Sequence, residues 1–188
     1  KEKGKQEKIW NEFQNQLDQK GLKIAKGVIQ DASFIEAEYG RARTAHEKKA
    51  EKEGKKIEYT EKQEAHMDKD GSYSVKHGQV HYGYKMHVKT DVKHGLIRNV
   101  ETTTAKDHDG TVDLIDKDDG KAYRDKGYCF TPVPDGVKDM TLQRATRGHP
   151  LTELQKERNK KISKVRSPGE RPYAVIKEVF HAGVTYVT

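Results

Sequence analysis

The chain has 188 residues, a formal net charge of +7, and only 32% hydrophobic residues against 36% charged ones. It is long enough for one domain with a modest core, and no run of about 18 apolar residues is present, which excludes a membrane-spanning helix. The single cysteine, Cys129, excludes an internal disulfide framework and a cysteine-rich metal site.

The basic excess favours a polyanionic partner, either nucleic acid or an anionic surface. No apolar signal-peptide core follows the N-terminus, so we expect a cytoplasmic protein. The chain starts at Lys1 and ends within an apolar-leaning stretch, which leads us to expect a fragment of a longer protein.

The first third of the chain predicts a helix, a strand and a charged segment. Apolar residues of 7–20 recur at helical spacing, and Gly21 ends that helix. Residues 28–37, VIQDASFIEA, are typical of a strand. Residues 38–71 are dense in Lys and Glu with few large aliphatic residues. We expect a solvated helix or a mobile insertion there, and assign 38–78 as a charged insertion after the first strand.

The middle of the chain predicts a hairpin. Residues 79–91, QVHYGYKMHVKTD, alternate between apolar and polar side chains, and 96–105 return as a second strand. His81, Lys85, His87 and Lys89 share the polar face. A solvated strand face is the simpler interpretation of these cations.

The remaining elements alternate between helices and short strands. A short helix should start after a cap at Asp107 or Asp109, and 121–125, KAYRD, form a short strand. A proline-rich loop and a possible strand near 140–142 precede a basic helix over 152–166, capped by Thr152. A hairpin beside strand–helix units predicts an α/β fold with a mixed sheet and flanking helices, preceded by an N-terminal helix and linker over 1–27.

Two acids occupy positions where a carboxylate is unusual. Asp31 lies within a predicted strand, and Asp125 ends another. Asp is depleted in strands, so each needs a reason. A turn residue explains Asp125 well and Asp31 less well, because the strand pattern continues beyond Asp31.

A third acid, Glu170, stands between two cations. It follows Arg166 by four residues and precedes Lys177 by seven, which places all three on one face of a regular helix. They could form a salt-bridged surface, or an acid that holds a metal between cations that hold phosphates. Residues 167–170, SPGE, also match a capping box. Three acids on separate elements of a basic chain suggest a two-metal site with oxygen ligands.

Four stretches of this sequence together resemble one family. They are VIQDASFIEA, QVHYGYKMHVKTD, AYRDKGY and KVRSPGERPYAVIKEVFHAG, in this order from about residue 8 to the C-terminus. They are similar to the catalytic core of DDE transposases of bacterial and archaeal insertion sequences, of the IS-four/IS-five group. The resemblance implies an RNase H-like fold over 28–188.

The resemblance also implies the site. Asp31, Asp125 and Glu170 match the catalytic, metal-binding triad. Arg166 and Lys177 match the cations that flank the third acid and contact DNA, whereas Ser163 stands where the family has a tyrosine.

Further positions resemble the family less closely. Lys85 and His87 lie in a family-like strand and are candidate DNA contacts. Asp109 also lies in a family-like stretch, although a helix cap is the simpler role for it. The spacing of His81, His87 and His94 matches no common zinc signature.

The implied reaction is cleavage of DNA at the element's ends followed by strand transfer to a target. The implied cofactor is a pair of Mg²⁺ ions, for which Mn²⁺ can substitute. The implied partner is double-stranded DNA, which would associate the protein with the nucleoid, and a homodimer is compatible with the sequence.

The alternatives are a related metal-dependent DNA nuclease and a degenerate, non-catalytic DNA-binding remnant. They stay open because no end-recognition region or final apolar helix is seen and because 129–136 depart from the family pattern.

Overall fold

The computed structural model describes residues 3–38, 45–55, 58–65 and 67–186. They divide into two compact units. The first unit comprises residues 1–32, 87–101 and 108–174, and the second comprises 33–86, 102–107 and 175–188. Strands β1 (Val28–Ala37), β3 (Gln79–Asp91) and β4 (Ile97–Thr104) contribute residues to both units.

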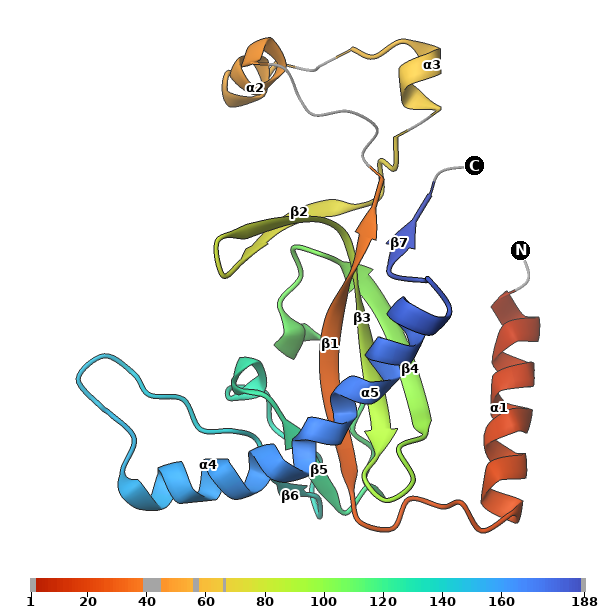
Figure 1. The fold of residues 1–188 in the computed structure, drawn as a ribbon, viewed down its shortest axis with the longest axis vertical. Coiled ribbons are helices and arrows are strands. Elements are labelled where there is room, and N and C mark those ends of the chain that lie inside the picture. The colour runs from red at the N-terminus through yellow and green to blue at the C-terminus, as the bar shows by residue number, and fades with distance from the viewer. Residues whose placement is uncertain (1–2, 39–44, 56–57, 66, 187–188) are drawn as a thin grey trace. The chain divides into compact units, whose positions relative to one another are not determined.

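Strand pairing gives a mixed sheet (Figure 1). The other strands are β2 (Ser72–Lys76), β5 (Lys121–Arg124), β6 (Lys138–Asp139) and β7 (Val184–Thr185). The paired order is β2-β3-β1-β5-β6, with β4 also pairing with β3 and β7 with β1. β2 runs antiparallel to β3, whereas β5 runs parallel to β1 and β6 parallel to β5. The predicted α/β class with a mixed sheet is confirmed.

The core of the first unit forms on both faces of β1. Successive side chains of a strand point to opposite faces. Val28 packs with Ile115, Ala122 and Val137. Ile29 packs with Tyr123, Leu142 and Ile162 of helix α4 (Glu153–Arg166) on the other face. Asp31 follows Ile29 by two residues and therefore shares the face that α4 covers.

The helices of the first unit begin and end close to their predicted bounds. Helix α1 (Lys3–Gln19) is followed by Gly21 at φ +78°, a conformation that favours glycine. Helix α4 carries the predicted cap, since Thr152 accepts from the backbone N–H of Gln155 and the Gln155 side chain accepts from that of Thr152.

Beyond α4 the chain stays helical but changes its hydrogen-bonding pattern. A 3₁₀ turn covers Ser167–Glu170, α5 covers Arg171–Ala174, and a π turn covers Val175–Val179. Ser167 has helical backbone angles, and its side chain caps no new helix. The capping-box interpretation of residues 167–170 is therefore wrong, and a uniform helical face through Arg166, Glu170 and Lys177 does not form.

The cap of the next short helix also differs from the prediction. The 3₁₀ helix Asp109–Thr111 starts after His108, whose Nδ1 accepts from the backbone N–H of Gly110 at 3.1 Å. Asp107 instead accepts from the Thr104 backbone and hydroxyl. A histidine ring nitrogen performs the role expected of a carboxylate.

The second unit contains a strand that the sequence did not predict. β2 forms a hairpin with β3, with Ser72 opposite Gly83 and Lys76 opposite Gln79. The end of the segment assigned as a charged insertion therefore belongs to the sheet. Short helices α2 (Ala45–Lys52) and α3 (Glu61–Glu64) precede it. After them, the Tyr84 hydroxyl donates to the Asp68 carboxylate at 2.7 Å.

The mobility expected of 38–71 stays a prediction. Residues 39–44, 56–57 and 66 of this segment lie outside the described residues. Helix α3 buries none of its side chains, so amides of α3 should exchange close to the rate of an unfolded chain.

Candidate active site

Asp31 lies within β1 and is anchored there by three contacts. One carboxylate oxygen, Oδ1, accepts from the Ala32 backbone N–H at 3.0 Å. The other, Oδ2, accepts from the Arg166 guanidinium at 2.8 Å. The Tyr173 hydroxyl donates to the Asp31 backbone carbonyl at 2.6 Å. The end of α4 and helix α5 are thus tied to Asp31.

Asp125 lies beside Asp31 because of the strand register. β1 and β5 are parallel, and Gln30 lies opposite Arg124. The next residue in each segment is an aspartate: Asp31 lies within β1, and Asp125 directly follows the end of β5, so the register places the end of β5 beside the middle of β1. The two acids that sequence reasoning singled out are therefore brought together.

The electrostatics of this pair follow from their closeness. Burial raises the pKa of the Asp31 carboxyl above its usual value, the positive charge of Arg166 opposes that rise, and the negative charge of Asp125 adds to it. A site that holds two carboxylates in this way favours a bound cation, which lowers the free energy of the ionised form.

The neighbouring Arg124 anchors the loop that follows Asp125. Its side chain is fully buried; Nε donates to Thr141 Oγ1 at 2.9 Å, and NH2 donates to the Thr131 carbonyl at 2.7 Å. The guanidinium also lies 5.8 Å from the ring centre of Tyr128. Sequence reasoning missed this residue, although an arginine inside a short strand next to an acid was a usable signal.

Glu170 is exposed, at the end of the 3₁₀ turn. The preceding Gly169 is buried against Ile29: a Cβ on Gly169 would lie 2.7 Å from Ile29 Cγ2. Ile29 and Asp31 share a face of β1, so the turn lies over the face that carries Asp31. Within the described ranges, however, no three His, Cys, Asp or Glu side chains gather closely enough to hold a metal ion. The structure thus joins Asp31, Asp125 and Arg166, but not the Glu170 carboxylate.

Gly169→Ala tests how tightly this turn is seated. The added methyl would overlap the buried, β-branched Ile29, so the turn must move away from β1. We expect the free energy of unfolding to fall by about 1–3 kcal/mol in denaturant titration.

The double variant Gly169→Ala/Ile29→Leu tests whether the loss of stability comes from the contact with Ile29. Ile29→Leu removes the branch that would be struck, so Gly169→Ala should cost less in the Ile29→Leu background than in the wild type. Equal costs in both backgrounds would show that the contact with Ile29 does not fix the turn.

Asp109, for which the sequence favoured the role of a helix cap, lies in different surroundings in the structure. A Cβ on Gly127, two residues after Asp125, would lie 3.6 Å from Asp109 Oδ2. Thr131 Oγ1 donates to the Gly110 carbonyl at 3.1 Å, which ties the loop that follows Asp125 to the 3₁₀ helix Asp109–Thr111. Burial raises the pKa of Tyr128, and the charges of Asp109 and Asp31 both add to that rise. Asp109 therefore lies near the acidic pair and does not cap a helix.

The other predicted DNA contacts are Lys177 and Lys85, which hydrogen-bond to residues other than the two aspartates, and His87, which is buried. Lys177, in the second unit, donates to Ser33 Oγ at 2.8 Å, and its partial burial lowers the pKa of its ammonium while Glu36 opposes that change. Lys85 is 9% exposed and donates to the Asp107 carbonyl at 2.6 Å, and His87 is 0% exposed. Lys85 and His87 therefore do not lie on a solvated strand face, and their contact with DNA stays a prediction. Ser163 is exposed.

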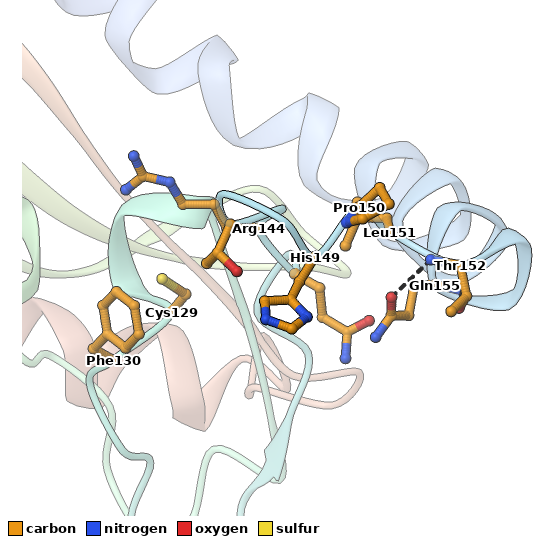
Figure 2. Close-up of a pocket in the computed structure, with 10 residues that line it drawn as sticks. Cys129, Phe130, Arg144, His149, Pro150, Leu151, Thr152 and Gln155 are labelled. Atoms are coloured by element: carbon orange, nitrogen blue, oxygen red, sulfur yellow. Dashed lines mark hydrogen bonds between the residues drawn. The ribbon is translucent and has the colours of Figure 1, made fainter.

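A separate pocket of about 420 Å³ lies at the start of α4. Figure 2 shows Cys129 and Phe130 on one side, the Thr152–Gln155 cap on the other, and His149 between them. Phe130 is 84% exposed. The stretch 129–136, where the sequence departs from the family pattern, thus begins at this surface pocket.

No helix in the described part of the chain combines the length and apolar character needed to cross a bilayer.

Comparison with known proteins gives the family. The family description "Transposase DDE domain" matches residues 23–187. The chain is 30% identical over 177 residues to the transposase for insertion sequence element IS1106 of Neisseria meningitidis serogroup B. That match covers 88% of this chain and 59% of the relative's length. No solved structure matches. The family match and the relative agree with the resemblance seen in the four sequence stretches, and the chain belongs to the DDE-domain transposase family of insertion sequences.

Proposed function

We propose that the chain is the catalytic core of an insertion-sequence transposase that cleaves DNA at the element's ends and joins them to a target. The main supporting observation is that the parallel register of β1 and β5 brings Asp31, within β1, beside Asp125, at the end of β5, with Arg166 bound to Asp31 at 2.8 Å. Paired carboxylates beside a cation suit phosphoryl transfer, which depends on positioning and charge neutralisation.

We also propose that the fold is RNase H-like over residues 28–188. Its support is the strand order: a hairpin pairs with β1 on one side, and the parallel strands β5 and β6 follow on the other. The proposed site lies at the carboxyl end of β5, beside the middle of β1, and α/β sheets commonly bind ligands at the carboxyl ends of their strands.

The chemistry of the donor set fits a divalent metal. Asp31 and Asp125 offer oxygen ligands, which Mg²⁺ and Mn²⁺ prefer. Burial raises the pKa of Asp31 because the ionised carboxylate is less stable away from water. A bound cation would stabilise the ionised form and so lower that pKa. When bound, two such ions supply Lewis-acid stabilisation of the attacking and leaving oxygens of a phosphate.

The chain's own residues would hold and orient the reactants. We assign Asp31, Asp125 and Glu170 as the acids that would hold the metal. Arg166 fixes the Asp31 carboxylate and, with Lys177, would neutralise phosphate oxygens of the DNA. Tyr173 holds the Asp31 backbone and so the direction of its side chain.

A plasmid assay tests this proposal. Purified protein with supercoiled DNA and Mg²⁺ or Mn²⁺ should produce nicked circles, and chelation of the metal should stop the reaction. The matched pair is Asp125→Asn, which should abolish nicking, and Asp118→Asn, an exposed acid whose loss should leave it unchanged. Nicking that Asp125→Asn and Asp118→Asn affect equally would refute the assignment.

Two further outcomes decide between the alternatives. Joining of a pre-nicked element end to a second plasmid identifies a transposase, whereas metal-dependent nicking without joining identifies a nuclease. DNA binding with no nicking under any metal identifies a non-catalytic remnant. Because the chain spans 59% of its relative's length, we expect weak, non-specific nicking from these residues alone.

A further inference from the structure

Nearly all of the chain's net charge is concentrated in one segment. Residues 143–171 contain nine lysines and arginines and three acids, a net of +6, against +7 for the whole chain. The segment begins at the pocket of Figure 2, continues through α4, and ends one residue after Glu170. Within α4 itself, six cations and two acids give a net of +4, so most of this charge lies along the helix whose last residue contacts Asp31.

The orientation of α4 decides which of these cations face outward. Ile162 is 1% exposed and packs on β1 and β5 residues. Lys160 and Lys164 stand two positions before and after it, which places each about 160° around the helix from Ile162. Both are exposed. We call Lys160 and Lys164 the outer lysines.

The two ends of α4 differ in charge. Near its start, Lys156 is paired with Glu153 at 2.8 Å, so that charge is already partly neutralised. Lys160 lies in the middle of α4 and Lys164 in its last turn, and in the part of the chain that the structure describes neither has a carboxylate within ion-pair distance. The last residue, Arg166, binds Asp31 at 2.8 Å. Cations at a helix C-terminus also complement its dipole, a stabilising effect of about 0.3–1 kcal/mol that requires no ligand.

We propose that the outer lysines of α4 hold the phosphate backbone of duplex DNA on the side of α4 that faces away from the sheet, whereas Arg166 of the same helix lies at Asp31. This rests on the proposed function and adds a DNA-contacting surface on the helix that ends at the proposed site. The two lysines lie about 6 Å apart along the helix axis, close enough for both to contact phosphates of one DNA strand. Contacts of this kind set position and affinity but carry no sequence information.

Salt-dependent binding tests the proposal. Affinity for a duplex of arbitrary sequence is measured by fluorescence anisotropy between about 50 and 200 mM salt, where phosphate contacts dominate. For Lys160→Ala/Lys164→Ala the slope of log affinity against log salt should fall by about 1.8, because each lost contact removes roughly 0.9, and binding should weaken about 10-fold or more. The control Lys8→Ala/Lys20→Ala removes the same charge from exposed positions at α1 and just beyond it, and should leave the slope unchanged.

The outcomes are separable from those of the plasmid assay. Equal slopes for the two double variants would refute the role of the outer lysines, even if wild-type protein nicks DNA in an Asp125-dependent way. A reduced slope only in the α4 variant would support it, even if no nicking occurs. Tighter binding to vesicles of anionic phospholipid than to duplex at equal phosphate concentration would overturn the assignment to DNA. If the alanine variant melts at a lower temperature, Lys160→Gln/Lys164→Gln provides the same measurement.

Discussion

Asp31→Asn is expected to abolish metal-dependent nicking and to remove the stabilisation that a divalent cation gives the protein. The substitution keeps the shape of the side chain but removes the charge that would hold a cation beside Asp125. Electrostatic stabilisation by a bound metal amounts to several kcal/mol, and 1.36 kcal/mol corresponds to ten-fold in rate, so we expect a loss of about 100- to 1,000-fold.

Thermal unfolding gives a second, independent readout. At a cation concentration of about 100 times the dissociation constant, binding stabilises the folded state by about 2.7 kcal/mol. Wild type and Asp118→Asn should both show this increase with Mg²⁺ or Mn²⁺, and Asp31→Asn should not. A variant that still nicks DNA at the wild-type rate would place the catalytic metal elsewhere.

Gly83→Ala is expected to have the largest effect on stability. Gly83 is buried in β3 at φ +137°, and a Cβ there would lie 2.4 Å from the Ile35 carbonyl oxygen and 2.6 Å from the Ala37 nitrogen. A strained backbone conformation costs about 1–3 kcal/mol, and overpacking adds about 1–3 kcal/mol. The free energy of unfolding in urea should therefore fall by about 2–6 kcal/mol, a large part of the stability of an ordinary domain.

Gly78→Ala separates the cost of the positive φ from the cost of overpacking. Gly78 also has a positive φ, +80°, but a Cβ there would meet nothing within 4 Å. It lies in the turn between β2 and β3 and should lose only about 1–2 kcal/mol, the cost of the left-handed conformation. If both alanines cost the same, the contact of Gly83 with β1 does not contribute.

Periodicity predicted the elements that bury a regular face. The strand at 28–37, the strand at 79–91 and the capped helix that ends at Arg166 agree with the structure, because each pairs a clear apolar repeat with a boundary signal. β2 and β7 were missed for the opposite reason. They are short, mostly exposed, and defined by backbone pairing with β3 and β1, which side-chain patterns do not report.

The site was predictable in part. Asp31 and Asp125 stood out because carboxylates are rare in strands, and the parallel register of β1 and β5 brings them together. The surroundings of Asp109 and Arg124 depend on contacts between short helices and loops that no spacing encodes. The placement of Glu170 could not be predicted from its spacing to Arg166 and Lys177. That spacing assumes a regular α-helix, whereas the residues between them form 3₁₀, α-helical and π turns in succession.

The π turn at Val175–Val179 makes this part of the chain sensitive to a change in length. A π turn holds one residue more than the α-helical turn it replaces, so deleting a single residue here would leave a continuous helix. Every later side chain would then be rotated by about 100° relative to the preceding helix. The Lys177–Ser33 contact depends on that extra residue, although the helix itself does not. A homologue one residue shorter at this point would keep its secondary structure and lose this lysine's position, a difference that an alignment would show only as a gap.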